Sequence, residues 1–149
     1  MIDLQTKSNI ELTGKNITIL GAGNSGVAAA ELLSKVGAIP FISEFKDNVD
    51  SDISKFKHEL GGHSINSLDC ELIIISPGIS DKIDIIQKAK LNGIPIVSEI
   101  ELASWFTEIP IMAVTGTNGK TTTTMLLNAM CQSANINSVM VGNIGTPFS

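Results

Sequence analysis

Residues 17–26 of this 149-residue chain read ITILGAGNSG, a short apolar run followed by three glycines with the spacing G-x-G-x-x-G. A turn of this kind bends the backbone from a strand into a helix and leaves the N–H groups of the helix N-terminus free to bind a diphosphate. Glu44 follows at the end of the next apolar run, where a carboxylate can accept hydrogen bonds from a ribose or a base. The segment predicts a nucleotide-binding βαβ unit, and taken alone it favours NAD or FAD over other diphosphates.

Similar apolar runs recur along the chain and alternate with segments of helical pattern. We expect strands at 17–20, 39–42, 72–75, 94–97, 111–114 and 138–141, and a further short strand is an option near 64–66. We expect helices at 25–36, 53–60, 82–91, 99–106 and 120–133, the first of them capped by Ser25. Because strands and helices alternate, the predicted fold class is α/β, with a Rossmann-like parallel sheet that carries helices on both faces.

A second glycine loop follows the apolar run at 111–114, where residues 116–121 read GTNGKT. The backbone of such a loop can surround a β-phosphate, Lys120 can reach the β and γ oxygens, and the Thr121 hydroxyl can bind Mg²⁺. A strict Walker motif has glycine where this chain has Val114, so the loop is a shorter variant. The loop predicts ATP and Mg²⁺ as cofactors, with Thr121 as the metal ligand. The predicted ATP-binding residues are Gly116, Thr117, Asn118, Gly119, Lys120, Thr121, Thr122 and Thr123.

The boundary between two domains is expected at 107–110, just before the second loop. Residues 1–108 would form the Rossmann-like domain, and residues 109–149 would form the first βαβ of a P-loop ATPase domain. A complete domain of that kind needs further strands and a later acidic residue that holds Mg²⁺. We therefore expect the chain to be a fragment of a longer protein.

Composition excludes several classes of protein. The net charge is −5 with no basic run, so nucleic acid is not expected as a partner. All ten basic residues are lysine, so phosphate has to be held by backbone N–H groups, hydroxyls or lysine. Two distant cysteines and the lack of a leader or long apolar run predict a cytoplasmic protein without a membrane segment. His58 and His63 are expected to be solvent-exposed histidines without a ligand role.

The two glycine loops, in this order, resemble those of the Mur ligase family. Further likeness lies in Glu44, in SPGI at 76–79, in EIEL at 99–102 and in GNIG at 142–145, and it covers essentially the whole chain. The resemblance implies that the first domain binds the UDP part of a substrate rather than a nicotinamide. The implied UDP-sugar contacts are Asn24, Ser25 and Gly26 to the diphosphate, Glu44, Phe45 and Lys46 around the uracil, Ser76 and Gly78 along the sugar path, and Asn143 at the muramoyl group.

The same resemblance implies a reaction in peptidoglycan precursor synthesis. Within the family, the likeness is to ligases that join D-glutamate to UDP-N-acetylmuramoyl-L-alanine with ATP, through an acyl phosphate. Lys120 would be the catalytic residue of this chain, acting with Mg²⁺ on the charge of the transferred phosphoryl group. The remaining catalytic groups would lie beyond this chain, so we expect the fragment to be inactive. The protein is expected to be a monomer. The alternatives are an NAD-dependent oxidoreductase domain and a non-catalytic UDP-sugar binding module.

Overall fold

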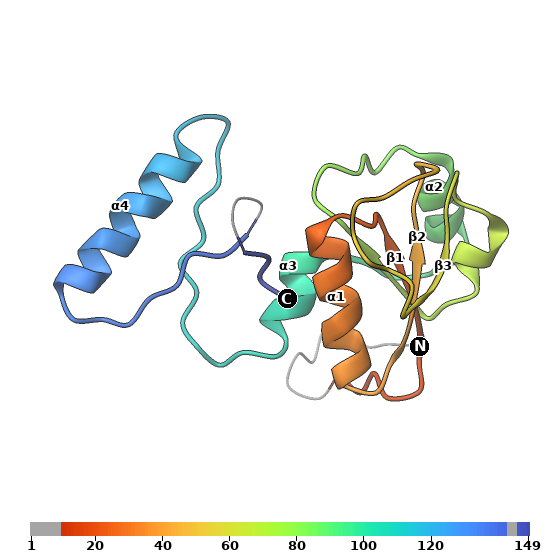
Figure 1. Cartoon of the computed structure of the whole chain (residues 1–149), viewed down its shortest axis with the longest axis horizontal. Helices are drawn as coiled ribbons and strands as arrows, with labels where there is room; N and C mark the ends of the chain where they lie inside the picture. The colour runs from red at the N-terminus through yellow and green to blue at the C-terminus, as the bar shows by residue number, and fades with distance from the viewer. Residues whose placement is uncertain (1–9, 143–145) are drawn as a thin grey trace. The chain divides into compact units, whose positions relative to one another are not determined.

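The structure, a computed structural model, describes residues 10–142 and 146–149. The chain forms two compact units (Figure 1). The first extends to Phe106 and also includes Phe148 and Ser149, and the second comprises Thr107–Pro147. The predicted boundary between residues 108 and 109 lies close to this division and stays a prediction.

The first unit contains a five-stranded, fully parallel sheet in the order β3-β2-β1-β4-β5. Its strands are β1 (Asn16–Leu20), β2 (Ile39–Ser43), β3 (Lys57–Glu59), β4 (Leu72–Ile75) and β5 (Ile96–Ser98). The chain passes from β1 outward to β2 and β3 and then returns to the other side of β1, where β4 and β5 follow. Ligands of open parallel sheets bind at the carboxyl ends of the strands beside such a reversal, here between β1 and β4.

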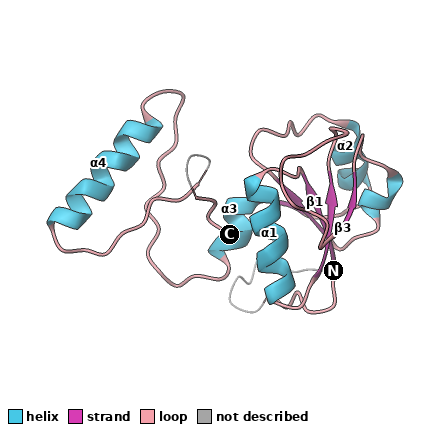
Figure 2. Ribbon diagram, in the orientation of Figure 1, coloured by secondary structure: helices cyan, strands magenta, loops and turns pink. Residues whose placement is uncertain are grey.

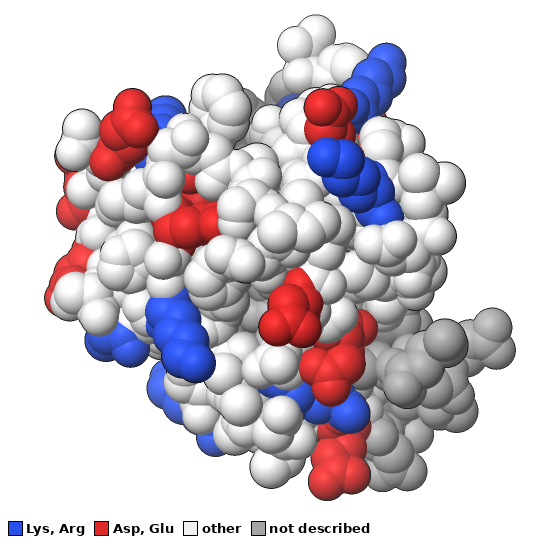
Figure 3. Space-filling view, turned by 90° about the vertical axis from the view of Figure 1, so that its right-hand side faces the viewer, with Lys and Arg blue, Asp and Glu red and all other residues white. Residues whose placement is uncertain are grey.

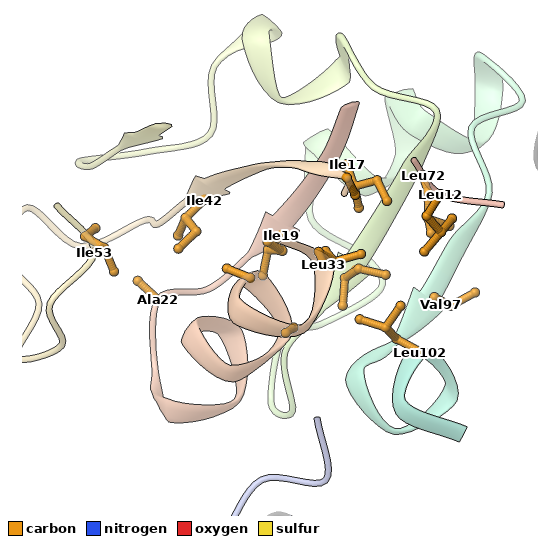
Figure 4. Packing of buried hydrophobic residues seen from close by; sticks show 14 residues of the cluster. Leu12, Ile17, Ile19, Ala22, Leu33, Ile42, Ile53, Leu72, Val97 and Leu102 are labelled. Atoms are coloured by element: carbon orange, nitrogen blue, oxygen red, sulfur yellow. The ribbon is translucent and has the colours of Figure 1, made fainter. Parts of the chain in front are cut away.

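Helices cover both faces of this sheet (Figure 2). One face packs against α1 (Asn24–Lys35) and α3 (Glu99–Ser104), and the other packs against α2 (Asp84–Leu91) and the short 3-10 helix η2 (Ile65–Leu68). Figure 4 shows the larger core, in which strand residues such as Ile17 and Ile19 meet Leu33 of α1 and Leu102 of α3. Neighbouring β-strand residues point to opposite faces, so Leu20 of β1 joins the second core with Ile86 of α2. The Rossmann-like part of the predicted fold class is confirmed.

Two predicted elements of the first unit are wrong. Residues 53–60 do not form a helix, because residues 57–59 pair with β2 as the edge strand β3, and tertiary pairing of this kind overrides local propensity. The segment near 64–66 is not a strand but the start of η2, where the Ser64 hydroxyl accepts a hydrogen bond from the Asn66 N–H. The N-cap of α1 is Gly23 rather than Ser25, and it makes no side-chain capping bond.

The second unit contains α4 (Lys120–Ser133), whose bounds are those predicted. The strands expected at 111–114 and 138–141 are not formed. A strand satisfies its backbone N–H and C=O groups only by pairing with another strand, and the described part of this unit offers none. Within the described ranges, no helix is long and apolar enough to cross a membrane.

Candidate nucleotide-binding site

The glycine turn after β1 joins the sheet to α1. Gly21 has a left-handed backbone (φ +97°), and its N–H donates to the Ser43 carbonyl at 2.8 Å. Gly26 is buried in the first turn of α1, where an added Cβ would overlap the Gly21 carbonyl oxygen. The helix therefore starts directly against the turn, and only glycine allows this approach.

The exposed side of the same turn is open. Gly23 is exposed in extended backbone, and a Cβ added there would meet no atom within 4 Å. Asn24 is exposed and Ser25 is partly exposed. Helix geometry leaves the first N–H groups of α1 without partners inside the helix, and they carry its positive dipole end. This arrangement can accept an anionic group beside Gly23.

Glu44 ties the end of β2 to the glycine turn. Its Oε2 accepts the Ala22 N–H at 2.8 Å, and its Oε1 accepts the Lys46 N–H at 3.0 Å. Partial burial raises the pKa of Glu44, but these N–H groups and that of Phe45 outweigh burial and hold the pKa below its usual value. The carboxylate therefore holds the glycine turn and the segment after β2 together, and each of its oxygens keeps lone pairs for a ligand.

The remaining predicted contacts lie at the same edge of the sheet. Phe45 and Lys46 follow β2 and are exposed. Ser76 follows β4, and its Oγ lies 3.4 Å from the Gly21 carbonyl oxygen, while Gly78 adopts a left-handed backbone (φ +91°) just beyond. The carboxyl ends of β1, β2 and β4 thus bring the predicted UDP-contacting residues of the first unit to one edge. Asn143 lies outside the described residues.

A polar cluster that the sequence does not predict lies beside Glu44. The Glu59 carboxylate accepts bonds from the hydroxyls of Ser43 (2.7 Å), Ser64 (2.5 Å) and Ser67 (2.6 Å) and from the Ser64 N–H (3.0 Å). Burial raises the pKa of Glu59, but these four donors outweigh it and lower the pKa to about 2. His63 belongs to this cluster, because its Nδ1 lies 2.7 Å from the Ser43 Oγ.

His63 is therefore not the freely exposed side chain that we expect from the sequence. It is partly buried, and its ring lies 6.2 Å from that of Phe45, centroid to centroid, with the two planes tilted by 45°. Burial lowers the pKa of His63, while the charges of Glu44 and Glu59 oppose that shift. His58 remains exposed on β3, as expected. The signal for His63 in the sequence is the glycine pair before it, which permits the tight loop after β3.

In the second unit, the loop at 116–119 leads into α4. Gly116 and Gly119 both have positive φ, and Gly119 is the N-cap of the helix. The Lys120 Nζ donates to the carbonyl oxygens of Gly116 (2.7 Å) and Thr117 (3.3 Å), so the lysine side chain lies along the loop. Thr121, Thr122, Thr123 and Asn118 are all exposed at this helix start.

Charged side chains, and the side-chain types that could bind a metal, are dispersed over the described part of the chain. Figure 3 shows lysine and acidic side chains interspersed with uncharged surface on the face that it presents. In the part of the chain that the structure describes, no three His, Cys, Asp or Glu side chains are grouped so as to hold a metal ion.

Comparison with known proteins supports one family. The model of the Mur ligase MurD-like N-terminal domain matches residues 15–98. The UDP-N-acetylmuramoylalanine–D-glutamate ligase of Chlorobaculum tepidum is 45% identical over 148 residues, covering 93% of this chain and 32% of that protein. The ligase of the same name from Chlorobaculum parvum is 43% identical, with the same coverage. The chain thus spans about a third of the length of the curated relatives it matches.

A solved structure supports the fold. A murein peptide ligase from Psychrobacter arcticus superposes with a TM-score of 0.57 at 24% identity, covering 82% of this chain and 27% of that one. The family match covers more than half of the chain and includes the glycine turn, Glu44 and Ser76. The chain therefore belongs to the Mur ligase family, as a MurD-like N-terminal domain with the residues that follow it.

Proposed function

We propose that the first unit binds the UDP part of UDP-N-acetylmuramoyl-L-alanine, and that the whole protein adds D-glutamate to that substrate with ATP. The observation that carries the proposal is the open space at Gly23, which lies at the free N-terminus of α1 beside the reversal of strand order. A diphosphate needs close approach of backbone N–H groups, and a chain without arginine depends on them more than most. The names of the Chlorobaculum relatives support the choice of substrate.

Each part of the site has a proposed role. The N–H groups at Asn24, Ser25 and Gly26 would hold the diphosphate, and Glu44, Phe45 and Lys46 would surround the uracil. Ser76 and Gly78 would line the path of the sugar, and Asn143 would contact the muramoyl group. The boundary between the UDP-binding domain and the ATP-binding domain is proposed at residues 108–109.

The second loop is proposed to bind ATP. The residues for this role are Gly116, Thr117, Asn118, Gly119, Lys120, Thr121, Thr122 and Thr123. The positive φ of Gly116 and Gly119 and the position of Lys120 along the loop fit a phosphate cradle at a helix start. The Thr121 hydroxyl would hold Mg²⁺, whose contribution when bound is to neutralise phosphate charge.

The proposed chemistry is amide formation in two steps. A carboxylate cannot be displaced directly by an amine, because its leaving group would be oxide. Attack of the L-alanyl carboxylate on the γ-phosphorus of ATP breaks the bond to ADP and gives an acyl phosphate. The D-glutamate amine then attacks the acyl carbon, inorganic phosphate leaves, and the amine loses a proton. Lys120 would stabilise charge on the transferred phosphoryl oxygens, and the residues that bind D-glutamate would come from the rest of the protein.

Thermal unfolding of the chain with separate ligands tests the proposal. UDP-N-acetylmuramoyl-L-alanine and UDP should each stabilise the first unit, by about 2.7 kcal/mol at one hundred times Kd. NADH at equal concentration should leave the transition unchanged, and Mg·ATP serves to probe the second loop. Stabilisation by NADH without stabilisation by UDP compounds would overturn the proposal in favour of an oxidoreductase domain.

A further inference from the structure

The loop after β3 places His63 next to the end of β2. Gly61 and Gly62 both have positive φ, and their N–H groups donate to the carbonyls of Lys46 (3.0 Å) and Glu44 (3.1 Å). These bonds fix the loop against the very segment that is proposed to meet the base. His63 comes next in the chain, so its ring lies at the base end of the site rather than at the diphosphate end.

The hydrogen bonds of Ser43 define which nitrogen of His63 carries hydrogen. Glu59 is ionised at neutral pH and can only accept, so the nearby Ser43 hydroxyl directs its single hydrogen to the Glu59 Oε1. The Ser43 Oγ is then an acceptor toward the His63 Nδ1, 2.7 Å away, and Nδ1 must carry the hydrogen. The neutral ring therefore has a bare Nε2, which is a hydrogen-bond acceptor.

This acceptor is held in place and is available. Ser43, at the end of β2, and Ser67 of η2 are fully buried, and their Oγ atoms lie 3.0 Å apart. The hydroxyl that fixes Nδ1 is therefore held inside the packed first unit. The His63 ring itself is only partly buried and contacts the exposed ring of Phe45. In the described ranges, 10–142 and 146–149, no hydrogen-bond partner meets Nε2. An oriented acceptor beside an aromatic ring suits the edge of a planar base that carries a donor.

We propose that His63 is a specificity-determining residue of the nucleotide site, whose Nε2 accepts the N3–H of the uracil ring. The inference rests on the proposed binding of UDP. Uracil carries a hydrogen on N3, whereas cytosine presents a lone pair at the same position. An oriented acceptor therefore favours UDP and opposes CDP, while the ribose and diphosphate of the two ligands are identical.

Calorimetric titration of the chain with UDP and CDP tests the proposal, using two matched variants. His63→Asn keeps an N–H donor near the Nδ1 position and so preserves the bond to Ser43, but it has no atom at Nε2. His58→Asn makes the same change on exposed β3. We expect the unsubstituted chain and His58→Asn to prefer UDP by roughly tenfold, and His63→Asn to lose that preference through weaker UDP binding.

A second measurement needs no variant and covers the case in which His63→Asn fails to fold. The ¹⁵N resonance of His63 Nε2 should move when UDP is added, as an acceptor nitrogen does on forming a hydrogen bond, and should stay in place with CDP. Retention of the UDP preference in His63→Asn, equal binding of UDP and CDP by the unsubstituted chain, or an unmoved Nε2 resonance would each overturn this inference and leave UDP binding standing. Failure of the unsubstituted chain to bind UDP at all would overturn the proposed function as well.

Discussion

The Glu44 carboxylate and the Ala22 N–H are joined by a 2.8 Å hydrogen bond, which links the end of β2 to the glycine turn after β1. The same carboxylate accepts the Lys46 N–H, so it organises two segments of the proposed nucleotide site before any ligand arrives. Glu44 is thus a structural residue as well as a proposed ligand contact.

Replacing this carboxylate should lower stability. In Glu44→Gln, the amide offers one acceptor oxygen to two backbone N–H groups, so one charge-assisted hydrogen bond is lost. The free energy of unfolding should fall by about 1.5–3 kcal/mol. Urea unfolding measures the change. Glu31→Gln is the control, because Glu31 pairs with Lys55 on the surface and should matter little. Equal stability of Glu44→Gln and the unsubstituted chain would contradict a stabilising role of the Glu44 carboxylate.

Two glycines of one turn should respond in opposite ways to the same change. Gly23→Ala adds a methyl group in open space with an allowed φ of −71°, so the free energy of unfolding should change by less than about 0.5 kcal/mol. UDP affinity should fall at least about tenfold, because the methyl group would occupy the proposed diphosphate position. Gly26→Ala adds the methyl group against the Gly21 carbonyl and should destabilise the fold. Thermal unfolding and UDP titration of both variants separate the effects. Undiminished UDP affinity in Gly23→Ala would show that no phosphate lies there.

Acid should weaken the fold partly through Glu59. The folded-state pKa of Glu59, about 2, lies below its usual value near 4.5, so its stabilising bonds are complete above pH 4.5 and are lost as the pH falls toward 2. Glu59→Gln is less stable at pH 7 but should lose less further stability between pH 5 and pH 2. Urea unfolding at several pH values gives the two slopes, and parallel slopes would contradict the assignment.

Nucleotide selectivity should depend on the charge of His63. Burial keeps its pKa below the usual 6.5 although the Glu44 and Glu59 carboxylates face it, so the ring is neutral at pH 7 and gains a hydrogen on Nε2 as the pH falls further. The UDP-to-CDP affinity ratio should therefore be constant above pH 7 and decline in acid. Comparing two diphosphates removes the titration of the phosphate itself. The ¹H–¹⁵N spectrum of the ring shows where His63 titrates, and a ratio that stays constant through that titration would contradict the role of Nε2.

The second loop should not contribute to UDP binding. Among the described residues, the Lys120 Nζ donates to the carbonyls of Gly116 and Thr117 in its own loop. Lys120→Ala should therefore change UDP affinity by less than about twofold and should abolish any stabilisation by Mg·ATP. Titration with UDP and thermal unfolding with Mg·ATP measure the two effects. A large loss of UDP affinity would contradict this separation, because it would show that Lys120 contributes to UDP binding.

The sequence predicts most of the sheet because β1, β2 and β4 are short apolar runs with a clear pattern, and β1 and β4 are buried along nearly their whole length. It fails at β3, since Lys57, His58 and Glu59 carry no apolar signal and become a strand only by pairing with β2. That failure also hides the polar cluster, because Glu59 comes to lie opposite Ser43 through the pairing of β3 with β2. The glycine turn after β1 is predictable from spacing alone, whereas a cluster built from residues 43, 59 and 63 depends on tertiary pairing.

Ser43 takes part in both halves of the proposed site. Its carbonyl oxygen accepts the Gly21 N–H, and its hydroxyl meets His63 and Glu59. In the proposed site, binding of the diphosphate and binding of the base would consequently be coupled through this buried residue. A nucleotide that engages both ends should immobilise the tips of β1, β2 and β3 together, whereas inorganic pyrophosphate, which reaches one end only, should not.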